Sequence, residues 1–358
     1  VCNCTTDAGE CNWDTNPLFC WFIDYLPDLD FRIHEIVEQV GADVEWLVTE
    51  YDIDAFRIDA AKHMNHVIMN RVALRLEERF EDGGGMPIYL VGETFVGDSG
   101  HGLIMEYVSD SELDAQYDFP LLYPIRDVFA FSSQGVDYLS DRRRISEEQY
   151  GEAYWLMSPF LGNHDIPRFA TYLHGDLPDP WSGAADPMRG ELNDANWNVI
   201  NRMSAGFAFV LTQPGIPLIY YGDEIGLYGG ADPDNRRMMS FNESLSEPQR
   251  TLLERVQQIG QARRDHESLR RGEFRELWVD RDGGGIMLYA RDNGDGDVAL
   301  VAFNVGNGGT RQVPIPADLT IDGTRFVDAL GSSRTASVTS ANLTLTLAQW
   351  EYVIYVPE

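Results

Sequence analysis

The sequence predicts an α/β region built on a parallel sheet, followed by an all-β region, and three observations carry this prediction. Between residues 30 and 272, short apolar runs alternate with stretches whose apolar residues recur at helical spacing, as in a parallel sheet that is doubly wound or closed into a barrel. After about residue 272 the apolar residues recur with a period of two between turns, which predicts a β-sandwich. Residues 1–29 are rich in Cys, Asn, Asp and Trp and show no period, so we expect a loop there.

The elements of the α/β region follow in order from local patterns. A helix is expected first, because apolar residues recur at helical spacing from Ile33 to Val48 and Asp30 can cap its start. A second helix should end before the three glycines at 83–85. Short apolar runs predict strands at 55–59, 88–92, 116–119, 155–161 and 217–221, and amphipathic stretches predict helices near 67–80, 124–131, 196–211 and 248–264.

In the all-β region, alternation predicts strands at 283–290, 297–304, 310–315 and 350–356. The run from Asp292 to Asp297 resembles a calcium loop, but its Asn-Gly and Asp-Gly pairs favour a hairpin turn. The bidentate Glu of an EF-hand is also missing. We therefore expect a turn, with the calcium loop as the alternative.

The net charge of the chain limits the kinds of partner that it can bind. The 358 residues include 58 Asp and Glu but only 27 Lys and Arg, which gives a formal net charge of −31. This balance disfavours binding to nucleic acid and a polybasic membrane anchor, and no apolar run is long enough to span a bilayer. Residues 1–20 lack the features of a signal peptide. Lys62 is the only lysine, and a salt-adapted organism or a GC-rich genome would each explain this composition.

All four cysteines, Cys2, Cys4, Cys11 and Cys20, lie within the first twenty residues. Two local disulfides would suit a secreted or periplasmic protein. A zinc site is the alternative, but the spacing does not match the usual C-x2-C pairs. We expect disulfides.

Charged residues gather where the predicted parallel strands end. Arg57 and Asp59 share one face of a strand, Glu93 ends the next, and His164 and Asp165 end a third. The carboxyl ends of parallel strands form the edge where α/β proteins place active sites. Each carboxylate alone could cap a following helix, but the combination indicates catalysis.

The set of residues points to sugar chemistry. The sequence contains no G-x-S-x-G elbow, no G-x-G-x-x-G after a strand and no Walker A motif. Paired carboxylates indicate glycosyl transfer or hydrolysis, in which one carboxylate attacks the anomeric carbon and another protonates the leaving oxygen.

Three segments resemble sequence signatures of glycoside hydrolase family 13, the α-amylase family, and occur in the family's order. These segments are Phe56–Met64, Val91–Phe95 and Phe160–Asp165. Three others resemble the end of the family's domain B, its last barrel strand and the loop after that strand; they are Leu26–Asp30, Gly215–Glu224 and Asp232–Arg236.

The resemblance implies a (β/α)8 barrel with a C-terminal antiparallel β-sandwich domain. About the fourth to the eighth barrel strands are expected in this chain, because the family's first signature, near the third strand, has no counterpart. The implied domains are a remnant of domain B (1–29), the C-terminal part of the catalytic barrel (30–272) and the sandwich (273–358). An N-terminal portion, either a separate chain or a part lost from a shortened sequence, is expected to complete the barrel, and a variant fold is the alternative.

The resemblance also implies roles. Asp59 matches the nucleophile, Glu93 the general acid and base, and Asp165 the third carboxylate, which holds sugar hydroxyls. Arg57 resembles the partner that keeps the nucleophile ionised, and His164 resembles a histidine that bonds the same sugar.

Other residues match the family's substrate contacts. Lys62 and His63 resemble a pair on the leaving-group side, and Asp232 and Arg236 resemble an ion pair further along the non-reducing side. The backbone carbonyl of His63 matches a frequent ligand of a structural calcium ion. Aromatic residues can also stack on sugars, and Trp13 and Trp21 are favoured for this role over Trp181 and Trp197.

The function expected from the resemblance is a retaining, endo-acting α-1,4-glucan hydrolase that acts on starch-like substrates, including maltooligosaccharides. A cyclodextrin glucanotransferase, a maltogenic amylase and a neopullulanase-like enzyme are alternatives, because hydrolysis and transglycosylation share one intermediate. A catalytically silent binding module is a further alternative, disfavoured because all three carboxylates are intact.

Overall fold

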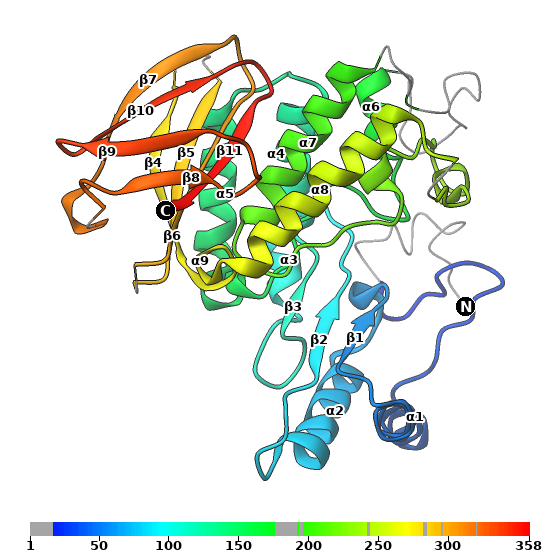
Figure 1. Ribbon diagram of the computed structural model, residues 1–358. Helices are drawn as coiled ribbons and strands as arrows, with labels where there is room; N and C mark the ends of the chain where they lie inside the picture. The colour runs from blue at the N-terminus through cyan, green and yellow to red at the C-terminus, as the bar shows by residue number, and fades with distance from the viewer. Residues whose placement is uncertain are drawn as a thin grey trace. The chain divides into compact units, whose positions relative to one another are not determined.

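The computed structural model describes residues 17–175, 192, 196–241, 244–281, 285–294, 296–319 and 321–358. The chain divides into two compact units (Figure 1). Unit 1 comprises residues 1–120 and 149–158, and unit 2 comprises residues 121–148 and 159–358. No helix within the described ranges is both long and apolar enough to cross a membrane.

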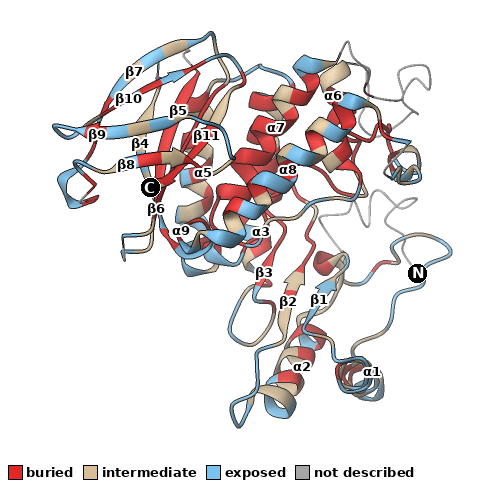
Figure 2. Cartoon of the chain, in the orientation of Figure 1, coloured by how far each residue is buried: buried red, intermediate tan, exposed pale blue. Residues whose placement is uncertain are grey.

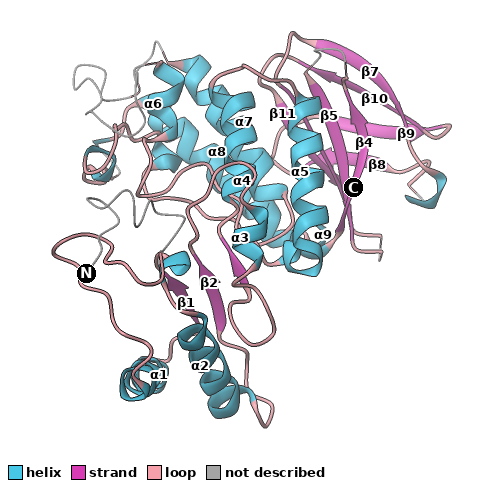
Figure 3. Cartoon of the chain, turned by 180° about the vertical axis from the view of Figure 1, so that it is seen from behind, coloured by secondary structure: helices cyan, strands magenta, loops and turns pink. Residues whose placement is uncertain are grey.

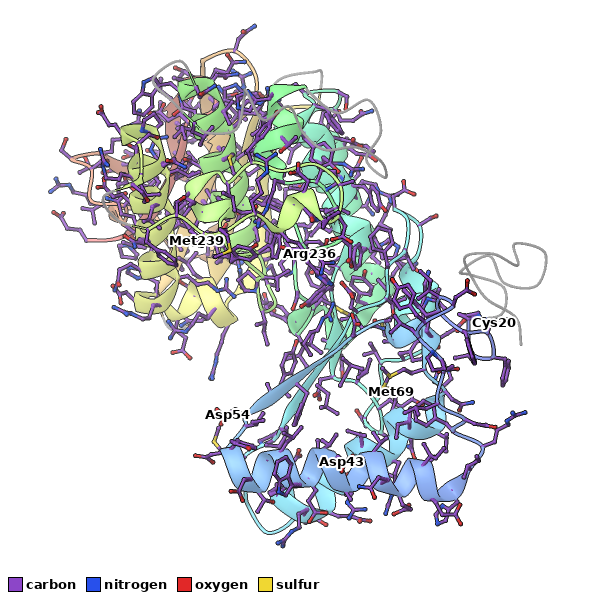
Figure 4. All side chains as sticks on the ribbon, turned by 90° about the vertical axis from the view of Figure 1, so that its right-hand side faces the viewer. Cys20, Asp43, Asp54, Met69, Arg236 and Met239 are labelled. Carbon is purple, nitrogen blue, oxygen red and sulfur yellow. The ribbon has the colours of Figure 1, made fainter. Side chains whose placement is uncertain are left out.

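Unit 1 contains a small parallel sheet in the order β1-β2-β3. Its elements are α1 (His34–Tyr51), β1 (Ala55–Ile58), α2 (His66–Leu76), β2 (Tyr89–Gly92), α3 (His101–Met105) and β3 (Ala115–Gln116). Figure 4 labels Asp43 on α1, Met69 on α2 and Asp54 just before β1. Apolar residues of α1 and α2 form one core with Leu90 of β2, so the two helices fix the sheet that carries the predicted strand ends.

Unit 2 combines helices with a larger antiparallel sheet (Figure 3). Its helices are α5 (Val136–Tyr150, whose last two residues belong to unit 1), α6 (Phe169–His174), α7 (Trp197–Thr212), α8 (Glu247–Asp265) and α9 (Glu267–Arg271), and α4 (Phe119–Ile125) enters it from unit 1. Figure 2 shows α7 buried along most of its length, whereas α8 alternates between buried and exposed residues. Ser246 begins α8 with a capping box, because its hydroxyl and the Gln249 side chain bond reciprocally to the backbone.

The all-β part of unit 2 is a sheet of eight strands in the order β4-β5-β6-β11-β8-β9-β10-β7. The strands are β4 (Glu273–Val279), β5 (Ile286–Asp292), β6 (Val298–Asn304), β7 (Gly309–Pro314), β8 (Arg325–Asp328), β9 (Thr335–Thr339), β10 (Asn342–Leu347) and β11 (Tyr352–Pro357). Asp292 of β5 lies opposite Val298 of β6 in an antiparallel pair. The predicted hairpin turn at 292–297 is therefore confirmed.

Several sequence expectations need correction. Asp30 does not cap α1; its carboxylate binds Arg32, and Ile33 occupies the capping position without a side-chain bond. The expected strand at 155–161 is reduced to isolated bridges at Ser158 and Phe160. The expected strand at 116–119 ends at Gln116, because α4 begins at Phe119.

Some elements had no sequence signal that we recognised. Helix α5 carries few apolar residues, and one of its buried side chains is Arg143, whose guanidinium lies 3.9 Å from the centre of the Phe274 ring. An arginine that packs in this way, through its stem and its flat head, takes a core position without adding to the apolar period. The strands β8, β9 and β10 are short and carry exposed polar residues at alternate positions.

Two arginines, the half-buried Arg263 and the buried Arg291, hold the C-terminal end of α7. The last carbonyls of a helix have no partner within the helix. Arg263 donates to the carbonyls of Leu211 at 2.9 Å, Gln213 at 3.0 Å and Gly215 at 2.7 Å, and Arg291 donates to that of Thr212. Burial lowers the pKa of Arg263 to about 10. These bonds fix the turn that leads into residues 216–221.

A buried ion pair lies in the interior of unit 2. The side chains of Arg168 and Asp223 are 0% and 2% exposed, and Arg168 Nη1 lies 3.0 Å from Asp223 Oδ1. Burial raises the pKa of Asp223 to about 6, although Arg168 acts in the opposite direction.

We predict that Phe303→Ala lowers the free energy of unfolding of unit 2 by about 3–5 kcal/mol, because it removes a fully buried ring from the core. The Phe303 ring lies 5.5 Å from that of Phe129 and 5.9 Å from that of Phe209. Denaturant unfolding measures the change. Phe241→Ala is the control, since Phe241 is 67% exposed and its loss should cost about 0.5 kcal/mol or less. Equal effects of the two substitutions would contradict the assignment of Phe303 to the core.

We also predict a pH signature for Asp223. A carboxyl group whose pKa is raised on folding contributes stability below its unfolded pKa and loses that contribution as pH rises through its folded pKa. The free energy of unfolding of the wild type, minus that of Asp223→Asn, should therefore fall between pH 4 and pH 6 and then level off. Denaturant titrations at a series of pH values measure this difference. A difference that grows over the same window would show that Arg168 outweighs burial.

Candidate active site

In unit 1, two acidic residues follow neighbouring parallel strands. Asp59 follows β1 and Glu93 follows β2, and the register that pairs Ile58 with Gly92 brings the two positions level. The amide of Glu93 donates to the carbonyl of Ile58 at 2.9 Å, so the pairing extends to the catalytic candidate itself. Oxygen atoms of the Asp59 and Glu93 carboxylates lie within 4.8 Å of each other.

Arg57 connects these two carboxylates. Its Nη1 donates to Asp59 Oδ1 at 2.6 Å, and its Nη2 donates to Glu93 Oε2. The side chain of Glu93 is 4% exposed, whereas that of Asp59 is 69% exposed. The family resemblance implied that Arg57 pairs with Asp59; the structure shows this pair and also a bond from the same guanidinium to Glu93.

The surroundings of Arg57 explain its protonation. Burial opposes its charge, but the carboxylates of Glu93 and Asp59 outweigh this and raise the pKa of Arg57. The guanidinium also lies 5.6 Å from the centre of the Tyr117 ring. Burial raises the pKa of the Tyr117 hydroxyl, while Arg57 acts to lower it. Arg57 therefore stays a cation, and the neutral side chain of Tyr117 lies beside it.

Lys62 and His63 lie in a short turn after β1. Lys62 is buried, and its Nζ donates to the carbonyl of Phe95, two residues after Glu93. The hydroxyl of Tyr107 donates to the backbone carbonyl of Lys62. The ring of His63 packs edge-on against Phe22, with 4.9 Å between ring centres. Lys62 therefore ties the turn after β1 to the segment after β2.

The aromatic candidates divide between described and undescribed residues. Trp21 is half-buried and lines a hollow of about 450 Å³ in unit 1, together with Phe19 and Asp28. Trp197 begins α7 in unit 2. Trp13 and Trp181 lie outside the described residues.

Three of the four cysteines, Cys2, Cys4 and Cys11, also lie outside the described residues, and Cys20 is buried. The predicted disulfides therefore stay a prediction.

In unit 2, the predicted residues His164 and Asp165 follow a short parallel contact between Phe160 and Leu218. The amide of Asp165 donates to the side-chain oxygen of Asn163 at 3.0 Å. His164 Nε2 lies 3.4 Å from Asp165 Oδ1. The side chains of both residues are partly exposed, so they remain accessible to a ligand.

The loop at 232–236 comes to this same group. Arg236 Nε lies 2.7 Å from Asp232 Oδ1, so the predicted ion pair is present. Arg236 Nη2 also lies 3.5 Å from Asp165 Oδ1, and its Nε donates to the carbonyl of His164. Figure 4 labels Arg236 near the centre of the view.

The structure therefore assembles the predicted residues as two groups, one in each unit. The unit 1 group is Arg57, Asp59, Lys62, His63 and Glu93, and the unit 2 group is His164, Asp165, Asp232 and Arg236.

Sequence reasoning missed three residues beside these groups: Tyr117, Arg168 and Asn235. Tyr117 follows β3, so the rule of strand ends could have found it. Arg168 lies three residues after Asp165 but bonds mainly to backbone carbonyls, and Asn235 acts through its side-chain amide. Contacts of this kind leave no pattern in a single sequence.

Comparison with known proteins identifies the family. The model of the α-amylase catalytic domain matches residues 8–271. A β/α-amylase from Paenibacillus polymyxa is 29% identical over 333 residues, which are 92% of this chain and 24% of that protein. A cyclomaltodextrinase from Geobacillus thermopakistaniensis is 26% identical over 341 residues, which are 94% of this chain and 50% of that protein. The chain thus spans half or less of the length of these two relatives.

A solved structure shows the same fold. The α-amylase from Geobacillus thermoleovorans, complexed with acarbose, superposes with a TM-score of 0.75 at 24% identity and covers 93% of this chain and 66% of that one. The fold is that of α-amylases, a TIM barrel with a C-terminal antiparallel β domain. With the family model matching most of the chain, we conclude that the chain belongs to the α-amylase catalytic-domain family of glycoside hydrolases.

Proposed function

We propose that the protein, at its natural full length, hydrolyses internal α-1,4-glucosidic bonds of starch-like polysaccharides and retains the configuration of the anomeric carbon. The observation that carries this proposal is the pair of carboxylates at the ends of β1 and β2. Oxygen atoms of Asp59 and Glu93 lie within 4.8 Å of each other. Retaining glycosidases place their carboxyl groups about 5–5.5 Å apart, and inverting enzymes need about 6.5–9.5 Å to admit a water.

The proposed mechanism has two displacements. Asp59 attacks the anomeric carbon and forms a bond to it, while Glu93 gives its proton to the leaving oxygen as the glycosidic bond breaks. Glu93 then takes a proton from water, and the water oxygen displaces Asp59. Arg57 supports the first step because its single positive charge lies between the two carboxyl groups. The charges balance when Asp59 is ionised and Glu93 carries the proton.

The remaining residues are proposed to bind the substrate. Asp165 and His164 hold hydroxyl groups of the sugar that reacts, and Lys62 and His63 act on the leaving-group side. Asp232 and Arg236 contact sugars further along the glucan, toward its non-reducing end. The ion pair between Arg236 and Asp232 and the contact of Arg236 with Asp165 support a shared role for this group. A relative complexed with acarbose supports an α-glucan as the substrate class.

A structural calcium ion is proposed on the family resemblance. The ligand suggested by the sequence is the backbone carbonyl of His63. In the described part of the chain, Asp, Glu, His and Cys side chains do not gather around His63 in a group of three or more. Calcium takes six to eight oxygen ligands, so these residues do not complete a site, and no step of the mechanism passes through the ion. Secretion or a periplasmic location is proposed from the cysteines.

We also propose that this chain supplies the later strands of the barrel and that an N-terminal segment supplies the others. Within the described residues, β1 pairs only with β2, which leaves its other edge open. An open edge of a parallel strand exposes backbone groups that a closed barrel would pair.

We predict that hydrogen exchange distinguishes a closed barrel from a sheet in which β1 has an open edge. Backbone amides of residues 55–58 that face away from β2 should exchange more slowly in the protein at its natural full length than in residues 1–358 alone, because a neighbouring strand accepts their hydrogen bonds. Exchange in β6, which pairs on both sides with β5 and β11, is the control. Equal exchange of residues 55–58 in both proteins would contradict the proposed barrel.

We predict that maltoheptaose is cut to linear products of several lengths whose new reducing ends are first formed as the α-anomer. Glu93→Gln should lower kcat by about 10²–10⁴-fold, because it removes the general acid and base but leaves the shape unchanged. Chromatography measures the products, and proton NMR measures the anomer. The control is Glu112→Gln, since Glu112 is a half-buried glutamate that is also paired with a basic side chain, that of His66 at 3.0 Å.

Each other outcome has a defined meaning. First formation of the β-anomer would exclude retention. Cyclic or elongated products would identify a glucanotransferase, and a single short product would indicate an exo-acting enzyme. No turnover by the wild type, with maltoheptaose still bound, would establish the silent binding module.

A further inference from the structure

Among the described residues, Arg168 is the most deeply buried cation near the unit 2 group. It lies three residues after Asp165, and its side chain is 0% exposed. Its Nε donates to the carbonyl of Asn235 at 2.7 Å, and its Nη1 donates to the carbonyl of Tyr221 and to Asp223 Oδ1. One guanidinium thus joins three segments of unit 2: the start of α6, the turn at 221–223 and the loop at 232–236.

Asn235, which Arg168 binds, is itself bonded to the segment that contains Asp165. Asn235 is completely buried, and its side-chain Nδ2 donates to the carbonyl of His164 at 2.7 Å and to that of Ile166 at 2.9 Å. These two carbonyls flank Asp165 on either side. The next residue in the loop is Arg236, whose Nη2 lies 3.5 Å from Asp165 Oδ1. Arg168 therefore binds the residue that fixes both Asp165 and its cationic partner.

We propose that Arg168, acting through Asn235, is a positioning residue that sets the place of Asp165 and Arg236 relative to each other. The inference rests on the proposed function, in which Asp165 and Arg236 contact the substrate. It concerns residues of unit 2 only.

The chemistry of the contacts explains why an arginine is required. Its flat, forked head presents several donors in fixed directions, whereas a lysine presents one point charge on a flexible stem. The rings of Tyr220 and Tyr221 lie 3.9 Å and 4.6 Å from the guanidinium carbon, so its plane is held between aromatic rings and backbone carbonyls. Asp223 supplies the opposite charge that a buried cation needs.

The test compares Arg168→Lys with Arg291→Lys in the protein at its natural full length. Arg291 is a matched control because it is equally buried and also donates to two backbone carbonyls, those of Gly272 and Thr212. Both variants should unfold at a lower temperature. Only Arg168→Lys should lower kcat/KM for maltoheptaose, by about 10²-fold per folded molecule, since a displacement of about 1 Å at a reacting group has an effect of that size. Equal kcat/KM for the two variants, per folded molecule, would overturn the proposal.

A second variant keeps the test decisive if Arg168→Lys does not fold. In Asn235→Asp, an ionised carboxylate faces the carbonyls of His164 and Ile166 and can donate no hydrogen bond, whereas its protonated form can donate one. The kcat of this variant, divided by that of the wild type at the same pH, should rise as pH falls from 8 to 5. A ratio that stays constant in folded protein would overturn the proposal.

The two proposals fail in different ways. A wild type without turnover on any α-glucan would remove the proposed function and the inference that rests on it. A wild type with normal turnover, together with an Arg168→Lys variant that matches Arg291→Lys, would remove the positioning role alone.

Discussion

The chain must hold acidic side chains close together, and arginine is the residue that makes this possible. With a net charge of −31 and a single lysine, almost every cation that can balance a carboxylate is a guanidinium. Arg57 serves Asp59 and Glu93, Arg236 serves Asp232 and Asp165, and Arg168 neutralises Asp223 in the interior. A guanidinium is always charged and offers several donors in one plane, so it can bind two partners at once.

Arginines also hold parts of the fold outside the unit 1 and unit 2 groups. Arg263 and Arg291 bind the last carbonyls of α7 and the turn after it. A separate backbone bond, from the amide of Leu218 to the carbonyl of Pro159, connects residues 216–221 with the segment that leads to Asp165. In unit 1, the register of β1 and β2 alone brings Asp59 and Glu93 level. Strand pairing therefore sets the coarse positions of the carboxylates, and arginines set their orientation and charge.

Much of this could be predicted from the sequence, for identifiable reasons. Parallel strands ending in charged residues mark one edge of a sheet, so Asp59 and Glu93 were expected together, and the Asp232–Arg236 pair followed from the family resemblance. Helix α5 was missed because polar residues, Ser140, Arg143 and Ser146, make up the middle of its buried face, which leaves few apolar positions to mark the helix. The role of Arg57 toward Glu93, and those of Arg168 and Asn235, depend on distances between residues far apart in the chain, and no local pattern encodes these distances.

The central claim is that Asp59 is the nucleophile of a retaining glycosidase, and trapping the intermediate tests it most directly. A 5-fluoro-α-glucosyl fluoride carries its own leaving group and forms a slowly hydrolysed bond to the nucleophile, so Glu93 is not needed to protonate it. We predict that mass spectrometry of peptides from the protein at its natural full length finds the added sugar on Asp59. Loss of this label in Asp59→Asn, with Glu93→Gln still labelled, would agree with the account. A label on another carboxylate, or turnover of α-glucans without any covalent adduct, would contradict it.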